Sequence, residues 1–165
     1  MDRNSEITEI VEKNPGIKFR EIMRKTGFKN GVLSYHAKKL EEDGSVKIER
    51  KSGETRFYPL CVTDEELDVI TSLRRDTQRN ILLSLLDGES LTFNEIVQKT
   101  RKAPSTVSTF LAKLVGANIV EFKMIDLKRV YMLTNVDMVR EIIIKYNPVL
   151  LERVAYNFAD TFSSL

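Results

Sequence analysis

The sequence predicts a mainly helical protein with small β wings, built from two copies of one unit of about 55 residues. Three observations lead to this prediction. When the chain is shifted against itself by 74 positions, residues 7–49 align without gaps with residues 81–123, which have a similar pattern of apolar and polar residues. Apolar residues in both copies recur at helical spacing, and each copy ends in two short β-like runs. Apolar residues make up 42% of the chain, which is enough for a packed core and argues against disorder.

The repeat is clearest in the middle of each copy. Residues 19–22 (FREI) lie over residues 93–96 (FNEI), and the pair KT follows in both copies. With one residue removed, residues 56–60 (RFYPL) lie over residues 129–133 (RVYML). Two copies are too few for a solenoid, so we expect two small domains of the same fold.

Each copy predicts three helices followed by a hairpin. The first helix ends at NPG (14–16) in copy one and at DG (87–88) in copy two, because these residues form turns. The second helix covers 19–26 and 93–100, and the third covers 30–42 and 104–116. The hairpins pair 46–49 with 55–58, around a tip at 51–54, and 119–124 with 129–133.

Local signals support the helix ends. Asn30 is a good N-cap for the third helix, Pro104 is tolerated at a first helical position, and TFNE (92–95) has the spacing of a capping box. Gly27 can supply the left-handed residue that ends the second helix. Arg101 takes its place in copy two, so we expect a different turn there.

The remaining segments are also helical in pattern. A capping box at 63–66 (TDEE) opens a run that fits either one long helix or two helices with a bend at 74–76. Beyond the second hairpin, two apolar helices are expected, with Pro148 between them. Their apolar residues are Val139, Ile142, Ile143 and Tyr146, then Leu151, Val154, Ala155, Phe158 and Phe162. They either dimerise the chain or cover copy two. The predicted domains are 1–62 and 76–135, with a linker helix at 63–75 and terminal helices at 136–165.

The order helix, helix, short turn, helix, hairpin is that of a winged helix-turn-helix. Residues 30–46 (NGVLSYHAKKLEEDGSV) and 103–120 (APSTVSTFLAKLVGANIV) resemble the recognition helix and first wing strand of ArsR- and MarR-type regulators. The whole chain resembles tandem winged-helix transcription regulators of archaea or bacteria, and an archaeal type is expected. The resemblance covers about three quarters of the chain.

The third helix of copy one has one face for the core and one for a ligand. Leu33, Ala37 and Leu40 form the core stripe, with His36 at its edge. The opposite face carries short or flexible donors with cations beside them, which suits a DNA major groove, and the hairpin is basic. The candidate DNA contacts of copy one are Lys29, Asn30, Ser34, Tyr35, Lys38, Lys39, Lys47, Arg50, Lys51 and Arg56.

Copy two is a weaker candidate, because the exposed face of its third helix is small and hydroxylated and has no central cation. Three roles remain open for copy two: it binds DNA more weakly than copy one, it serves as a scaffold, or it contacts a protein. Its candidate DNA contacts are Arg101, Lys102, Ser105, Ser108, Thr109, Lys113, Lys128 and Arg129.

Other classes of function have little support. The sequence has no P-loop, dinucleotide-binding glycine pattern or nucleophile elbow, so we expect neither an enzyme nor a cofactor. The single His36 and the single Cys61 leave too few ligands for a zinc site. We expect His36 to lie at the edge of the core and Cys61 to pack as a small hydrophobe.

No apolar run reaches the roughly 18 residues needed to cross a membrane, and residues 1–6 do not begin a secretory signal. A cytoplasmic protein is expected.

The net charge of +2 agrees with a nucleic-acid partner only weakly, with the positive excess in residues 1–60 and 76–135. The first hypothesis is a sequence-specific regulator of transcription that binds double-stranded DNA through helix 30–42 and its basic wing. The alternative is a protein-interaction module of a transcription assembly or another assembly, and RNA binding is a third reading. The other expected partners are a second copy of the chain, bound through the terminal helices, and the transcription machinery.

Overall fold

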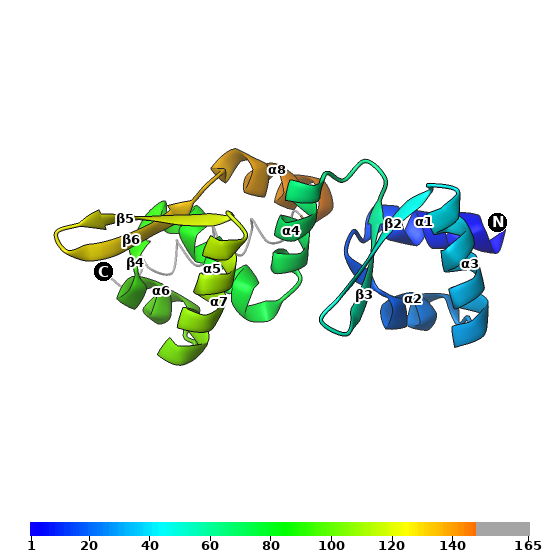
Figure 1. Cartoon of the computed structure of the whole chain (residues 1–165), viewed down its shortest axis with the longest axis horizontal. Coiled ribbons are helices and arrows are strands. Elements are labelled where there is room, and N and C mark those ends of the chain that lie inside the picture. The colour runs from blue at the N-terminus through cyan, green and yellow to red at the C-terminus, as the bar shows by residue number, and fades with distance from the viewer. Residues whose placement is uncertain (148–165) are drawn as a thin grey trace, which may run out of the picture. The chain divides into compact units, whose positions relative to one another are not determined.

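The computed structural model describes residues 1–147 of the chain, which form eight helices and two small antiparallel sheets (Figure 1). The protein is mainly helical, as predicted, and carries two helix-turn-helix units in tandem. The first unit, hereafter unit 1, is Met1–Leu67, and unit 2 begins at Asp68. The predicted helix around Leu151, Val154, Ala155, Phe158 and Phe162 lies outside the described residues.

Unit 1 begins with three helices and ends with a hairpin. Its elements are α1 (Arg3–Lys13), β1 (Ile17–Lys18), α2 (Phe19–Thr26), α3 (Asn30–Glu42), β2 (Val46–Lys51) and β3 (Glu54–Pro59). Asp2 caps α1 by accepting a 2.7 Å hydrogen bond from the N–H of Ser5, and this bond lowers the pKa of the Asp2 carboxyl. α2 and α3 have the predicted bounds.

The helices of unit 1 close over one face of its sheet. Ile7, Ile22, Leu33 and Phe57 have no exposed surface and form the centre of the core. The strand order is β1–β3–β2, and Ile48 of β2 lies opposite Phe57 of β3. This core fixes α3 beside the hairpin, so that the helix and the wing present a common surface.

The run from Thr63 to Gly88 forms two helices, which resolves the alternative left open by the sequence. α4 (Asp64–Leu73) and α5 (Asp76–Gly88) are separated at Arg74 and Arg75. α4 starts at the predicted capping box: Thr63 Oγ1 accepts from the N–H of Glu66, and the Glu66 carboxylate accepts from the N–H of Thr63.

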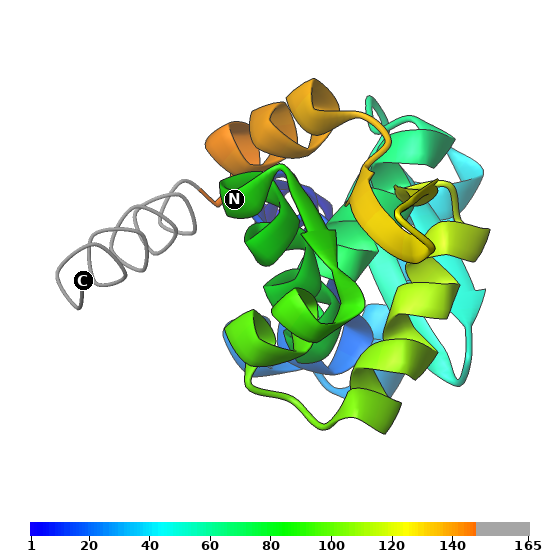
Figure 2. The same cartoon turned by 90° about the vertical axis from the view of Figure 1, so that its left-hand side faces the viewer.

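Unit 2 repeats the arrangement of unit 1. Its elements after α5 are β4 (Ser90–Thr92), α6 (Phe93–Thr100), α7 (Pro104–Gly116), β5 (Val120–Ile125), β6 (Lys128–Leu133) and α8 (Val136–Tyr146). The strand order is β4–β6–β5. In Figure 2 the β5–β6 hairpin runs beside α7. Ile81, Leu82, Ile96 and Val107 have no exposed surface and form part of the core of this unit.

Three local expectations are corrected. Asn30 is not the N-cap of α3: Lys29 occupies that position, and Asn30 is the first helical residue. Arg101 does not produce a different turn, because it adopts the same left-handed conformation as Gly27. Cys61 is exposed rather than packed.

Candidate nucleic-acid interface

The recognition helix of unit 1, α3, divides into a buried and an exposed face. Leu33, Ala37 and Leu40 are at most 5% exposed, so the predicted core stripe is confirmed. The predicted ligand face is open to solvent: its members Lys29, Asn30, Ser34, Tyr35, Lys38 and Lys39 are all exposed. α3 therefore presents a continuous polar surface that a DNA groove could accommodate.

Contacts within α3 give this surface a defined arrangement. Ser34 Oγ donates to Asn30 Oδ1 at 3.3 Å, which joins two of the short polar side chains. The Lys39 ammonium lies 4.6 Å from the centre of the Tyr35 ring, within range of a cation–π contact. The ammonium of Lys38 pairs only loosely with Glu42, at 4.0 Å, and both side chains are well exposed. Such an exposed pair is weak, so Lys38 is available to a stronger anion.

His36 lies half-buried at the edge of the core, as expected, and has a partner that the sequence did not reveal. Its Nδ1 forms a 2.6 Å hydrogen bond with Asn4 Oδ1 of α1. The Tyr35 ring meets the imidazole edge-on at 5.2 Å between centroids. His36 thus fixes the position of Tyr35 on α3 and ties the N-terminal helix to it.

The wing of unit 1 offers fewer free cations than the sequence suggested. Arg50 and Lys51 are exposed, and their partners Glu41 and Glu49 lie on the surface or near it. Lys47 is half-buried, and its ammonium donates to the carbonyl oxygen of Val62. These contacts leave the end of the hairpin, at Arg50 and Lys51, as its basic part.

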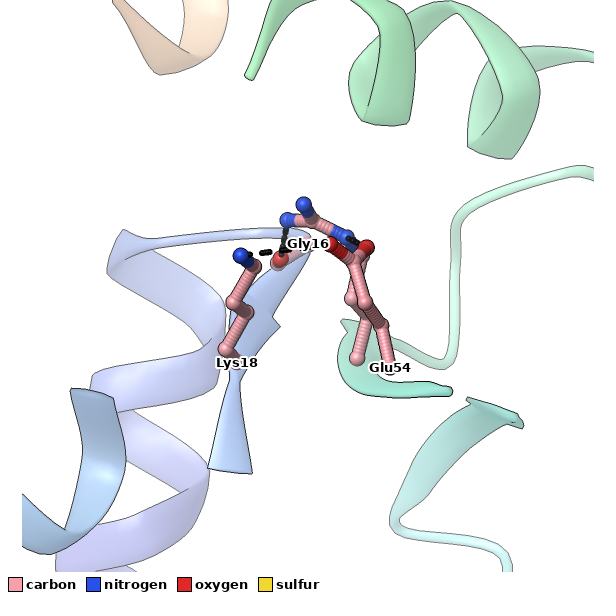
Figure 3. Close-up of polar contacts among 4 residues, drawn as sticks. Gly16, Lys18 and Glu54 are labelled. Carbon is pink, nitrogen blue, oxygen red and sulfur yellow. Dashed lines mark hydrogen bonds and ion pairs between the residues drawn. The ribbon is translucent and has the colours of Figure 1, made fainter. Parts of the chain in front are cut away.

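Arg56 is a structural residue, which corrects its assignment as a DNA contact. It is 4% exposed, and its guanidinium donates to the Gly16 carbonyl oxygen at 2.8 Å and to the Glu54 carboxylate at 3.0 Å. Glu54 also pairs with Lys18 at 3.2 Å, and Figure 3 shows how Gly16, Lys18 and Glu54 meet at one end of the short strand β1. A buried guanidinium must be paired, and the partners of Arg56 lie within the protein. Its charge therefore helps to join β1 to β3 and does not face a ligand.

Unit 2 presents a different surface. In its recognition helix α7, Val107, Leu111 and Leu114 are buried, while the candidate contacts Ser105, Ser108, Thr109 and Lys113 are exposed. Arg101, Lys128 and Arg129 are exposed as well. Lys102 forms an ion pair with Asp76 at 2.6 Å, which ties it to the start of α5.

An apolar groove lies between α7 and the wing of unit 2. It has a volume of about 230 Å³ and is lined by Phe93, Ser108, Leu111, Ala112, Val115, Phe122, Arg129 and Tyr131. The Arg129 guanidinium lies 4.4 Å from the centre of the Phe122 ring. A groove so rich in hydrocarbon is a poor site for a phosphate, because burying an ionised group among apolar side chains is costly.

The wing of unit 2 is apolar at its tip, which was not predicted from the sequence. Met124, Ile125 and Leu127 are 60%, 51% and 96% exposed. The repeat contains the sign of this difference. A shift of 74 positions puts Arg50 and Lys51 of the basic wing over the apolar residues Met124 and Ile125.

Within residues 1–147, no group of three or more His, Cys, Asp or Glu side chains is placed to hold a metal ion. The same part of the chain contains no helix with both the length and the apolar character needed to span a bilayer.

Comparisons with known proteins agree with the duplicated architecture. Residues 1–70 match a family described as an N-terminal HTH domain, and residues 75–121 match the arsR family of bacterial regulatory proteins. No curated protein matches the chain. Together, the two family matches support a DNA-binding role in the regulation of transcription.

Two solved structures show distant similarity. HlyU from Vibrio cholerae is 20% identical, with a TM-score of 0.42 over 47% of this chain and 84% of that one. The second is the homodimeric winged helix-turn-helix DNA-binding domain of Mb0332 from Mycobacterium bovis, a possible ArsR-family transcriptional regulator. It is 21% identical, with a TM-score of 0.42 over 59% of this chain and 84% of that one. These likenesses are too distant to add to the family matches, which cover both helix-turn-helix units. The chain is a tandem helix-turn-helix protein of the ArsR-like regulator type.

Proposed function

We propose that the chain is a sequence-specific transcription regulator that binds double-stranded DNA through unit 1. α3 enters the major groove, with Asn30, Ser34, Tyr35 and Lys38 toward the base edges. Lys29 and Lys39 neutralise phosphates at the sides of the helix, and Arg50 and Lys51 contact the backbone next to the wing. As a regulator of transcription the protein would work in the cytoplasm and meet the transcription machinery on DNA.

One observation carries this proposal: the polar face of α3 is exposed along its whole length, with the exposed cation Lys29 at its start and Lys38 and Lys39 farther along the helix. A recognition helix needs such a face, because groove readout requires side chains that reach the bases without displacing the core. The half-buried Lys47 and the buried Arg56 are left out of the proposed contacts, since their polar groups are used within the protein.

The test compares DNA binding of charge-matched variants of the full chain. Binding sites are first selected from random duplex DNA, and affinities are then measured by gel shift at fixed salt. We expect Lys38→Ala/Lys39→Ala to lower the affinity at least tenfold, because Lys38 lies on the face proposed to reach the bases and Lys39 lies beside that face, next to the phosphates. Lys13→Ala/Arg140→Ala removes the same charge from α1 and α8 and should change the affinity less than twofold. Equal affinities for the two double variants would refute the proposal.

The second candidate function is a protein-interaction module, and the apolar wing and groove of unit 2 favour it for that unit. We therefore assign DNA contact to unit 1 first and leave Arg101, Lys102, Ser105, Ser108, Thr109, Lys113, Lys128 and Arg129 as weaker proposed contacts. RNA binding, the third hypothesis, is tested by competition between duplex DNA and RNA of equal length. RNA that competes as well as duplex DNA would contradict the assignment of α3 to the major groove.

A further inference from the structure

The groove between α7 and the wing of unit 2 combines apolar walls with polar groups that have no partner. Its volume is about 230 Å³, and its walls include Leu111, Val115 and Phe122. α7 and the hairpin lie side by side, so the groove separates the recognition helix from the sheet (Figure 2). A concave apolar surface with a few polar groups is typical of a small-molecule site, and this one is smaller than the roughly 300–1,000 Å³ of sites for drug-sized ligands.

The floor of the groove contains a hydroxyl group without a partner. Tyr131 lies in the middle strand β6, opposite Phe122 of β5 and Leu91 of β4. It is only 7% exposed, yet its hydroxyl forms no hydrogen bond within residues 1–147. In that part of the chain, only Gln78 Oε1 and Arg79 Nε are fully enclosed without a partner, so the Tyr131 oxygen is reachable from the groove. A ligand that bonds to this oxygen would remove the cost of an unpaired polar group.

The rim of the groove carries an unpaired guanidinium. Arg129 precedes Tyr131 by two residues on β6, so both side chains lie on the same face of the sheet. Arg129 is exposed, and its guanidinium lies over the Phe122 ring. It forms no ion pair with the carboxylates of the described residues. Contact with the ring leaves the N–H groups of the guanidinium free, and a carboxylate can accept two of them in parallel.

Unit 1 shows that the fold does not require a hydroxyl at the floor. Ile48 lies opposite Phe57, as Phe122 lies opposite Tyr131. The two hairpins therefore correspond under a shift of 74 positions, without the one-residue gap inferred from the sequence. Phe57 has no exposed surface, so the position of Tyr131 is a plain core position in unit 1.

The same shift shows three further differences around the groove. Two positions that are charged in unit 1 are apolar in unit 2, and one position at the rim has gained a cation. The corresponding pairs are Lys38 and Ala112, Glu41 and Val115, and Thr55 and Arg129. These differences give unit 2 a site for a molecule with an apolar body and one negative charge.

We propose that the groove of unit 2 binds a small monocarboxylate that has an apolar body and a second oxygen. The carboxylate accepts from the Arg129 guanidinium at the exposed rim, where it also stays in contact with water. Ser108 Oγ, which has no partner within residues 1–147, is a second donor on the α7 side. The apolar body lies between Leu111 and Phe122, and the second oxygen bonds to the Tyr131 hydroxyl.

The chemistry of the groove disfavours other classes of ligand. A cation would face Arg129, and like charges repel. A phosphate dianion needs more than one cation, and the apolar walls offer none. A wholly apolar molecule would leave the Tyr131 hydroxyl unpaired in a dry site. Charge and polarity together therefore select a monocarboxylate.

A bound carboxylate has a consequence for DNA. It would occupy Ser108 and Arg129, which are two of the weaker proposed DNA contacts of unit 2. The ligand and DNA would then compete for unit 2, whereas the contacts of α3 in unit 1 stay open. This consequence rests on the proposed function, but ligand binding does not, so the two are measured separately.

The first test titrates the isotope-labelled full chain with hexanoate and with its neutral amide, hexanamide, and follows the backbone amide resonances. We expect hexanoate to bind with a dissociation constant below about 1 mM and to shift the resonances of Ser108, Phe122 and Arg129. Hexanamide should bind at least tenfold more weakly, because it has no charge for Arg129. No hexanoate binding at about 10 mM, or equal binding of the amide, overturns the proposal.

The second test removes the cation at the rim. Arg129→Gln should weaken hexanoate binding at least tenfold, because the carboxylate loses its charged donor. Arg140→Gln removes the same charge from the exposed surface of α8 and should change the dissociation constant less than twofold. Far-UV circular dichroism should be the same for both variants. An Arg129→Gln chain that binds hexanoate as the wild type does overturns the proposal.

The third test addresses the hydroxyl at the floor. Tyr131→Phe gives unit 2 the residue that unit 1 carries at the same place, Phe57, so the fold accommodates it. The ligands are hexanoate and 6-hydroxyhexanoate, which has an oxygen at the far end of the same chain. We expect the variant to change the ratio of the two dissociation constants about fivefold, in favour of hexanoate. An unchanged ratio would overturn this placement of the ligand.

A peptide tests the alternative occupant, the C-terminus of a partner protein. A tetrapeptide that ends in leucine presents the same carboxylate and an apolar side chain. If it binds the groove at least tenfold more tightly than hexanoate, the groove belongs to a protein partner and the small-molecule proposal is wrong. Affinity for the selected DNA site reports on the proposed function alone. A chain that binds hexanoate but no DNA would refute that function and support the ligand site.

Discussion

Gly27 and Arg101 end α2 and α6 in the same left-handed conformation, with φ angles of 74° and 55°. Their N–H groups donate to the carbonyl oxygens of Met23 and Val97, at 2.8 and 3.0 Å. The duplicated unit therefore keeps its turn between the second and third helices, although one copy uses a residue with a Cβ there. A left-handed conformation costs roughly 1–2 kcal/mol for such a residue.

The first prediction follows from this strain. Arg101→Gly should raise the free energy of unfolding by about 1 kcal/mol, because glycine adopts positive φ without the steric cost. Urea denaturation of the full chain, followed through the unfolding of unit 2, measures the change. Gly27→Arg in unit 1 is the reciprocal variant and should lower the stability by a similar amount. A loss of stability in Arg101→Gly would mean that its side chain, not its backbone, matters at this turn.

The helices could be predicted because their signals are local and occur twice. α2, α3, α6 and α7 begin and end at the predicted residues, since turn residues and apolar spacing in one copy support the reading of the other. β1 and β4 were missed, because strands of two and three residues have no periodicity.

The candidate site could be predicted only in part. The exposed face of α3 follows from helical spacing, which the sequence contains. The burial of Arg56 does not, because its acceptor Gly16 lies 40 residues away and the two meet only when β1 pairs with β3. Cys61 was expected to pack, yet nothing covers it within residues 1–147, so it is exposed. Sequence patterns predict which face of an element is apolar, but not which charged group is paired across the fold.

The second prediction concerns Arg56. Arg56→Ala should lower the free energy of unfolding by about 3 kcal/mol, because it leaves the Gly16 carbonyl and the Glu54 carboxylate without their buried donor. Thermal or urea unfolding measures the loss. Arg50→Ala is the matched control: its guanidinium pairs with Glu41 on the surface, and its removal should change the stability by less than about 0.5 kcal/mol. If the two variants were equally stable, the contacts of Arg56 would not hold β1 to β3.

The third prediction distinguishes phosphate contacts from base contacts on α3. Lys39→Ala should reduce the slope of log K against log salt by about 1, because one phosphate contact is lost. Ser34→Ala should weaken binding to the selected site and leave the slope unchanged, since a hydroxyl releases no counterion. Titrations at several salt concentrations give both quantities. An unchanged slope in Lys39→Ala would remove this residue from the phosphate contacts.

The fourth prediction concerns the tip of the unit 2 wing. Asp126 and Leu127 both have positive φ, 50° and 65°, in a two-residue turn that favours Asn-Gly. Asp126→Asn/Leu127→Gly should therefore raise the free energy of unfolding by about 1 kcal/mol, because it relieves strain at both positions. Unit 1 provides the comparison, since its tip, Ser52 and Gly53, already has a glycine at the second position. Urea denaturation measures the change, and an unchanged free energy of unfolding would mean that the positive φ angles at this tip carry no strain.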